Sequence, residues 1–186
     1  LSCFFGLIQG NCSQSEEYNI STILPLYYGD IWYGNGKEIE KIFNEKDVKI
    51  IVEVGSWLGY STTHFGALVG PLGKVYAIDH WQGSIEHQST HKKLLPTLYE
   101  QFLSNMIHKN LQEIVVPLRM SSKEGSELFS KNGVEVDLIY IDASHDTKSV
   151  LEDLNLWFPL VRGKGILCGD DWKWDSVRIA VQKFAK

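Results

Sequence analysis

The stretch from residue 51 to residue 61, IVEVGSWLGYS, constrains the fold of this chain more than any other. Its first four residues are apolar apart from Glu53, which predicts a strand buried on both faces of a sheet. Gly55 then ends the strand in a turn, and the residues from Ser61 onward continue as a helix. A strand, a glycine turn and a helix N-terminus in this order are typical of the ligand cradle of open α/β sheets.

The spacing of the glycines indicates what kind of ligand this cradle suits. A dinucleotide site requires G-x-G-x-x-G, whereas here the pattern is Glu-x-Gly-x-x-x-Gly, with Glu53, Gly55 and Gly59. A carboxylate at the strand end favours a cationic cofactor over a pyrophosphate. A tight strand-to-helix turn without any ligand is the simpler alternative.

Strand-like and helix-like segments alternate along the rest of the chain. Further strands are predicted at 74–79, 114–118, 136–142 and 165–169, and helices at 35–44, 95–107, 124–131, 150–160 and 176–185. This alternation predicts an α/β domain with a doubly wound, mostly parallel sheet and right-handed crossovers. The length fits one domain, which we place at residues 35–186 behind an N-terminal segment of residues 1–34.

Residues 1–12 (LSCFFGLIQGNC) are uncharged, largely apolar and too short to span a membrane. They are consistent with the remnant of a signal peptide, which would mean export, or with a helix packed on the sheet. We favour the packing helix and a cytoplasmic protein. Cys3 and Cys12 could pair only in an oxidising compartment, whereas Cys168 is expected to be a core thiol. The net charge of −5 argues against nucleic acid as a partner, and self-association stays open.

Carboxylates follow three of the predicted strands, at the sheet edge where ligands bind in this topology. Asp79 ends the second strand and can accept both ribose hydroxyls of a nucleoside-like ligand, with a solvated strand-end Asp as the alternative. Asp142 ends the fourth strand, and Asp170 and Asp171 end the fifth. Two carboxylates at ~4 Å repel by ~4 kcal/mol at an effective dielectric constant near ~20, so we expect either a retained proton or a divalent cation among them. All-oxygen ligands favour Mg²⁺, with Mn²⁺ and Ca²⁺ open, and scattered surface acids are the alternative.

Several aromatic and histidine residues near these strand ends have two interpretations each. Trp81 could stack on an adenine ring or pack in the core. His87 and His91 have the i, i+4 spacing of a zinc pair, but no third ligand is evident, so we favour a polar lid over the acceptor site. Trp172 and Trp174 could frame the acceptor.

Glu53 to Ser61 resembles the first motif of class I S-adenosylmethionine-dependent methyltransferases. Together with Asp142, Asp170 and Asp171, it is similar to the metal-dependent O-methyltransferases, the group of catechol and macrolide sugar O-methyltransferases. The likeness covers about residues 48–172. It implies a Rossmann-like methyltransferase fold, and because that fold normally has two further strands, we expect a chain that is truncated at its C-terminus.

The resemblance also implies roles for individual residues. His145, three residues beyond Asp142, is at the position of the general base, and a His with a pKa near ~6.5 suits that role; a solvent-exposed His is the alternative. Mg²⁺ is implied at Asp142, Asp170 and Asp171. The residues implied in S-adenosylmethionine binding are Glu53, Gly55, Ser56, Trp57, Gly59, Ser61, Asp79, His80, Trp81, Ser121 and Asp142.

The resulting hypothesis is a magnesium-assisted O-methyltransferase that acts on a small-molecule or sugar hydroxyl, such as a diol or a catechol. A nicotinamide-dependent oxidoreductase shares the strand and the turn, but it lacks a role for the three carboxylates. A non-catalytic binding protein of the same fold is the third hypothesis.

Overall fold

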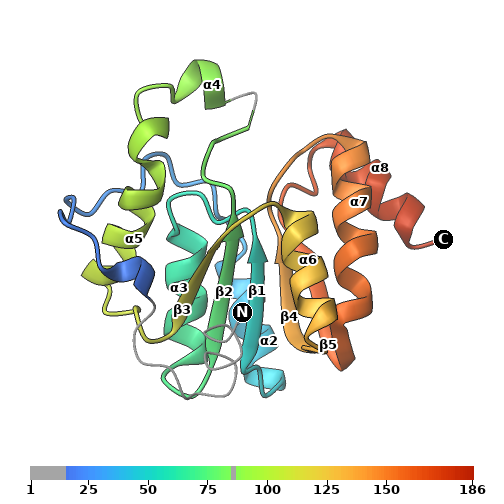
Figure 1. The fold of residues 1–186 in the computed structure, drawn as a ribbon. Coiled ribbons are helices and arrows are strands. Elements are labelled where there is room, and N and C mark those ends of the chain that lie inside the picture. The colour runs from blue at the N-terminus through green and yellow to red at the C-terminus, as the bar shows by residue number, and fades with distance from the viewer. Residues whose placement is uncertain (1–15, 85–86) are drawn as a thin grey trace.

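The computed structural model describes residues 16–84 and 87–186, and its centre is a five-stranded sheet (Figure 1). The strands are β1 (Ile50–Val54), β2 (Lys74–Asp79), β3 (Val115–Arg119), β4 (Val136–Ile141) and β5 (Val161–Gly169). All neighbours pair in parallel in the order β3-β2-β1-β4-β5. The predicted parallel, doubly wound sheet is therefore confirmed, and the chain reverses its winding direction between β1 and β4.

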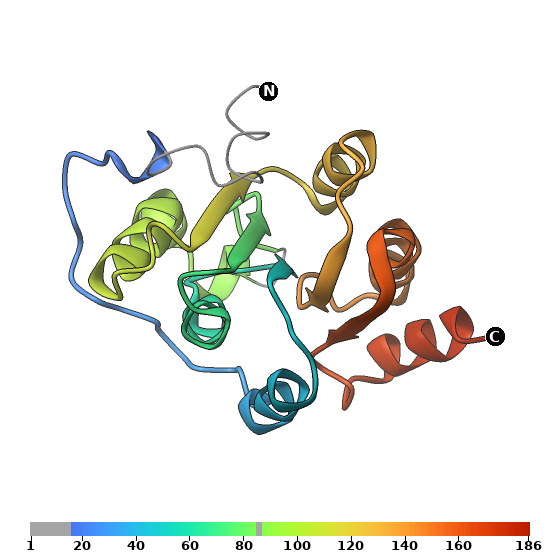
Figure 2. The same ribbon diagram turned by 90° about the horizontal axis from the view of Figure 1, so that it is seen from below.

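Helices cover both faces of this sheet, as the view from below shows (Figure 2). One face packs against α2 (Gly36–Glu45), α3 (Tyr60–Val69) and α5 (Leu98–His108) through a buried cluster that includes Phe65 and Phe102. The other face packs against α6 (Ser122–Lys131), α7 (Thr147–Trp157) and α8 (Asp175–Phe184), with Phe129 and Trp157 fully buried.

The helix boundaries follow from caps and prolines. The Ser121 hydroxyl accepts from the backbone N–H of Glu124, and the Glu124 side chain binds Ser121 in return, so a capping box starts α6. The helix expected at 95–107 begins as a 3₁₀ turn, η2 (Leu95–Thr97), and the one expected at 150–160 ends as another, η3 (Phe158–Leu160). Each of these turns contains a proline, which cannot continue an α-helix. A short helix, α4 (His87–Thr90), precedes them.

Residues 19–33, which we call the N-terminal strap, follow the 3₁₀ turn η1 (Glu16–Tyr18) and run along α5 and α3 without helix or strand (Figure 2). Polar side chains of α5 bind its backbone. Asn105 accepts from the N–H of Tyr27 at 3.1 Å and donates to its carbonyl at 2.6 Å, and Gln101 donates to the carbonyl of Pro25 at 2.8 Å. The helix or signal remnant expected at residues 1–12 lies outside the described residues.

Three smaller expectations concern the edge of the sheet, the thiols and the membrane. Among the described residues, β5 pairs with β4 and has no strand on its outer side. Cys168 in β5 is a free thiol that packs against the core, as expected, whereas Cys3 and Cys12 lie outside the described residues. None of the helices in the described ranges is long and apolar enough to cross a bilayer.

Candidate active site

The turn between β1 and α3 lies at the switch point of the sheet. Gly55 has φ 92°, and its N–H donates to the carbonyl of Ile78 at 2.8 Å. A Cβ at Gly55 would lie 2.0 Å from the carbonyl oxygen of Asp142, so only glycine allows the loop after β4 to pass so close. Gly59, with φ 82°, is held against α5, where a Cβ would lie 2.5 Å from Met106. The two glycines thus fix the turn against β4 on one side and against α5 on the other.

Glu53 is fully buried, and its carboxylate accepts hydrogen bonds from the hydroxyls of Ser61 and Thr62. Burial raises the pKa of Glu53 to about 7, and the two hydroxyls act in the opposite direction. Glu53 lines neither of the cavities described below. With its carboxylate enclosed by the first turn of α3, Glu53 ties β1 to that helix. Its expected position beside a cationic cofactor stays a prediction.

Asp79 ends β2 and lies partly buried beside the same turn. One carboxylate oxygen accepts from the backbone N–H of Trp57 at 3.0 Å, and the other accepts from that of Trp81 at 2.7 Å. Each oxygen keeps a free lone pair, and Asp79 lines the smaller cavity. Its carboxylate can thus position the turn and accept from a ligand hydroxyl at the same time.

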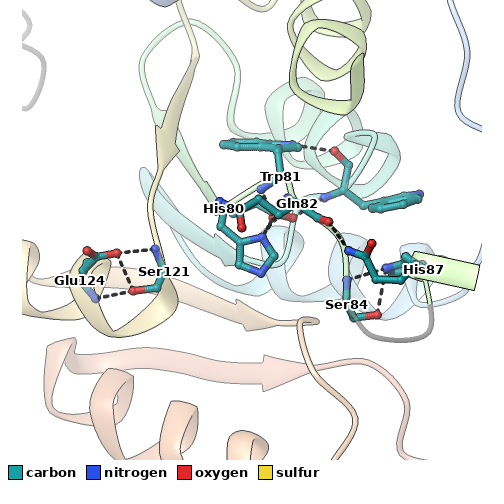
Figure 3. Close-up of polar contacts among 10 residues, drawn as sticks. His80, Trp81, Gln82, Ser84, His87, Ser121 and Glu124 are labelled. Atoms are coloured by element: carbon teal, nitrogen blue, oxygen red, sulfur yellow. Dashed lines mark hydrogen bonds and ion pairs between the residues drawn. The ribbon is translucent and has the colours of Figure 1, made fainter. Parts of the chain in front are cut away.

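Trp81 is 1% exposed and packs on Tyr99 and Phe102, and its indole N–H donates to the carbonyl of Trp57 at 2.8 Å (Figure 3). Of its two interpretations, core packing describes its position, and the buried ring is not available to stack on an adenine. His80 lines the smaller cavity, and its Nδ1 accepts from the N–H of Gln82 at 2.9 Å (Figure 3). Ser121 lines that cavity too, as the N-cap of α6.

The carboxylates after β4 and β5 converge with a histidine. Ligand atoms of Asp142, His145 and Asp171 lie within 4.8 Å of one another, and His145 Nε2 is 2.8 Å from Asp171 Oδ2. Asp170 is held differently, because its Oδ2 accepts from the hydroxyl of Tyr140 at 3.0 Å and its Oδ1 accepts from the N–H of Asp171 at 2.8 Å. The grouping thus differs from the expected set of Asp142, Asp170 and Asp171, since His145 lies inside the cluster.

The cluster carries an excess of negative charge. Desolvation raises the pKa of Asp142 well above its usual value, and the nearby charges of Asp170, Asp171 and Glu53 raise it further, whereas His145 lowers it. The ring of His145 stacks on Trp174 with centroids 4.8 Å apart, which fixes the imidazole beside the carboxylates. Such a cluster favours a bound cation or a retained proton.

Two adjoining cavities open at this edge of the sheet, of about 850 Å³ and 310 Å³. They share five lining residues: Gly55, Trp57, His87, Asp142 and Ala143. The larger cavity contains the acid cluster together with Ser56, Gly59 and Ser61 of the turn. The smaller cavity contains the ends of β2 and β3. The turn and the loop after β4 therefore form the common wall.

We did not predict from the sequence that the N-terminal strap contributes to this site. Tyr28, Trp32 and Tyr33 of the strap line the larger cavity, as do Tyr60 and the expected Trp174, whereas Trp172 does not. The only signal in the sequence is the density of aromatic residues in YYGDIWYG, residues 27–34. His87 and His91 line the same cavity, where the His87 ring stacks on Trp57 with centroids 4.1 Å apart. This position agrees with the expected lid.

A family model described as a methyltransferase domain matches residues 52–172. An O-methyltransferase from Bacillus cereus, solved with S-adenosylhomocysteine, is 17% identical with a TM-score of 0.64, and the match covers 100% of this chain and 77% of that one. TomG of Streptomyces achromogenes, an O-methyltransferase of tomaymycin synthesis solved with S-adenosylmethionine, is 14% identical with a TM-score of 0.65, over 91% and 71%. CalS11, a TDP-rhamnose 3′-O-methyltransferase of calicheamicin biosynthesis, is 17% identical with a TM-score of 0.52, over 80% and 67%.

No curated protein matches the chain. The structural matches share the fold at low identity, and the family match covers more than half of the sequence, including the end of β1, the turn and the carboxylates after β4 and β5. The family match also argues against the nicotinamide-dependent oxidoreductase, because it assigns the turn with Gly55 and Gly59 to a methyltransferase domain. The chain belongs to the methyltransferase-domain family.

Proposed function

We propose that this protein is an S-adenosylmethionine-dependent, magnesium-assisted O-methyltransferase. The observation that carries the proposal is the position of Asp142, which belongs both to the cluster with His145 and Asp171 and to the wall between the two cavities. A methyl donor held along the turn would thus meet an acceptor held at the acid cluster.

The residues around the smaller cavity fit the donor. Asp79 offers carboxylate lone pairs to ribose hydroxyls, and His80 and Ser121 line the part of the cavity beyond it, where an adenine would lie. Gly55, Ser56, Trp57, Gly59 and Ser61 line the larger cavity along the turn and would take the methionine part. The carboxylate of Asp142 suits the cationic amino group of that part.

The donor set fits Mg²⁺, because Asp142 and Asp171 supply hard carboxylate oxygens within the cluster and Asp170 would supply a third carboxylate beside it. The raised pKa of Asp142 supports a cation there as well, since a cation would relieve the repulsion among the three carboxylates. When bound, Mg²⁺ would lower the pKa of the acceptor hydroxyl and hold the acceptor in place. Tyr140, through its hydrogen bond to Asp170, would keep that carboxylate oriented.

His145 would remove the proton of the acceptor hydroxyl. Trp174 fixes its ring and Asp171 accepts at its Nε2 edge, so the imidazole is oriented before the acceptor enters. The acceptor oxygen would then attack the methyl group in line as the bond from carbon to sulfur breaks. The proton is then on His145, and the neutral thioether S-adenosylhomocysteine leaves. Holding the oxygen and the methyl group at near-attack distance would supply much of the acceleration.

The acceptor would be a small molecule or a sugar with a ring hydroxyl, such as a diol or a catechol. The aromatic lining of the larger cavity, with Trp32, Tyr33, Trp57 and Trp174, suits the flat face of either kind of ring. The names of TomG and CalS11 support O-methylation of small molecules or sugars within this fold.

The decisive experiment combines metal removal with a single substitution. EDTA should abolish methyl transfer from S-adenosylmethionine and leave its binding unchanged in calorimetry, because the metal serves the acceptor. Re-addition of excess Mg²⁺ should restore transfer. His145→Ala should lower kcat by roughly 10²–10⁴-fold with unchanged donor affinity. Full activity in EDTA would refute the metal, and binding of NAD in place of S-adenosylmethionine would refute the reaction class.

A further inference from the structure

The charges that line the larger cavity are of one sign. Four carboxylates line it, those of Asp30, Asp142, Asp170 and Asp171, and no Lys or Arg does so among residues 16–84 and 87–186. Residues 1–15 and 85–86 contain no Lys or Arg in the sequence, so their side chains cannot add a permanent cation. A negatively charged acceptor would therefore find no cationic side chain of this chain lining the cavity.

The nearby basic residues do not change this balance. Lys92, Lys93 and Lys173 follow or precede lining residues in the sequence, but all three are exposed and none lines the cavity. The Nδ1 of His87 already accepts the backbone N–H of Ser84 at 3.1 Å, so this ring nitrogen faces the chain's own backbone (Figure 3). The Nε2 edge of His145 is occupied by the carboxylate of Asp171.

Bound S-adenosylmethionine and Mg²⁺ would not make the net charge of the larger cavity positive either. A divalent cation and the net single positive charge of S-adenosylmethionine together balance three of the four carboxylates, so no positive charge is left over. An anionic group that entered would lose hydration without gaining a partner, which is strongly unfavourable.

The walls of the same cavity favour rings and cations. Trp32 and Trp57 lie with ring centroids 6.2 Å apart on one side, and Trp174 covers His145 on another. Trp32 is 57% exposed, so part of its ring is available to a ligand. Indole faces attract cationic groups, and Asp30 lies among the same lining residues.

We propose that the larger cavity selects ring-bearing acceptors that are neutral or carry an amine, and that it discriminates against acceptors with a carboxylate, a phosphate or a nucleotide diphosphate. The inference rests on the proposed O-methyl transfer and narrows its acceptor class. The proposed selectivity distinguishes this chain from CalS11, whose name specifies a nucleotide-linked sugar as the acceptor.

Binding of matched compounds tests the proposal independently of turnover. One series is methylcatechol, dopamine and dihydroxyphenylacetate, which differ in the charge of the tail. The other is methyl rhamnoside and thymidine-diphosphate-rhamnose. Calorimetry with S-adenosylhomocysteine and Mg²⁺, at about pH 8 where an ordinary His is neutral, should show at least one series that binds. In that series the anionic member should bind about tenfold or more weakly than the neutral one, as expected for an unpaired charge.

Equal or tighter binding of the anionic member overturns the proposal, as does the absence of binding in both series. Failure of the proposed function would look different: acceptors would bind with the expected selectivity, but no methyl group would be transferred from S-adenosylmethionine to any of them.

A pair of strap variants tests the cause of the selectivity. Ile31 and Ile23 are 55% and 53% exposed, and Ile31 lines the larger cavity whereas Ile23 lines neither cavity. Ile31→Lys should improve the affinity for the anionic member relative to the neutral one by about tenfold, and Ile23→Lys should leave the ratio unchanged. An unchanged ratio in Ile31→Lys, or an equal change in Ile23→Lys, overturns the proposal.

Discussion

Asp79 has a structural task besides the one proposed for it. Its carboxylate accepts from the backbone of Trp57 in the turn and from that of Trp81 after β2, and so joins two loops that border the smaller cavity. Removal of the carboxylate should therefore affect the cavity and the turn together.

Asp79→Ala should weaken S-adenosylmethionine binding about tenfold or more, because charge-assisted hydrogen bonds are worth ~1.5–3 kcal/mol. Isothermal calorimetry measures the change, and thermal unfolding shows whether the fold persists. Asp47→Ala is the matched control, since the Asp47 side chain is 81% exposed and forms a surface ion pair with Lys49. An unchanged dissociation constant in a folded Asp79→Ala variant would remove Asp79 from the donor site.

Glu53 makes the stability of the fold depend on pH. Its pKa in the folded state, about 7, lies above the ordinary 4.5, so between these values the folded protein keeps a proton that the unfolded chain loses. The stabilisation that Glu53 contributes should be fully present below about pH 4.5 and should be lost as the pH rises towards 7. At 1.36 kcal/mol per pKa unit, the loss is up to about 3 kcal/mol.

Glu53→Gln cannot titrate and should lack this contribution. Urea unfolding of the variant and of the original protein across this pH range measures it as the difference between the two slopes. The prediction fails if the two proteins lose stability in parallel as the pH rises.

At the scale of elements, α5 holds the strap by its backbone, and Asn105 contributes most to this contact. Its amide binds both backbone groups of Tyr27, donates to the carbonyl of Leu58, and accepts from Gln101. Asn105, Leu58 and Gln101 are buried, whereas Tyr27 is 51% exposed, so the bonds to Leu58 and Gln101 are the ones that solvent is least able to replace.

Asn105→Ala should lower the free energy of unfolding by about 2–3 kcal/mol, since it leaves buried polar groups unpaired. Because the strap lines the larger cavity, the KM of the acceptor should rise more than the dissociation constant of the donor. Asn155→Ala, which removes an exposed bond to the carbonyl of Leu151, is the control and should change neither. Equal losses in both variants would contradict the role given to the strap.

The strands and most helices are predictable because local sequence determines them. Continuous apolar runs such as residues 138–141 form strands only when both faces are covered, and the parallel pairing of β4 with β5 then brings Asp142 and Asp170 to one edge. The breaks at Pro96 and Pro159 are visible in the sequence, although the hydrophobic periodicity continues through them.

The remaining details depend on tertiary packing. Trp81 follows a strand end, and only the position of α5 decides that its ring is buried. His145 meets Asp171 through two loops whose course local sequence does not determine. The strap lacks any periodicity, because its bonds go to side chains of α5 and not to a neighbouring strand.

For the whole molecule, the order of the strands implies an order of local stability. β1 pairs with β2 on one side and β4 on the other, whereas β5 pairs with β4 alone among the described strands. Amide hydrogen exchange followed by mass spectrometry should be slowest in β1 and β4, where exchange requires global unfolding, and faster in β5 and in the strap. Exchange in β5 as slow as that in β1 would contradict this order and would mean that its outer edge is protected.

The attachment of the strap by its backbone also affects how this protein can change over generations. The α5 side chains bind backbone carbonyl groups, which every residue type provides, and backbone N–H groups, which every type except proline provides. The side chains of Ile23, Leu26, Tyr27, Ile31 and Trp32 stay exposed. Substitutions at these exposed positions leave the tethers and the sheet intact. Ile31 and Trp32 also line the larger cavity. Substitutions in the strap can therefore change this wall of the cavity one residue at a time without changing the sheet. We expect related sequences to differ first in the strap.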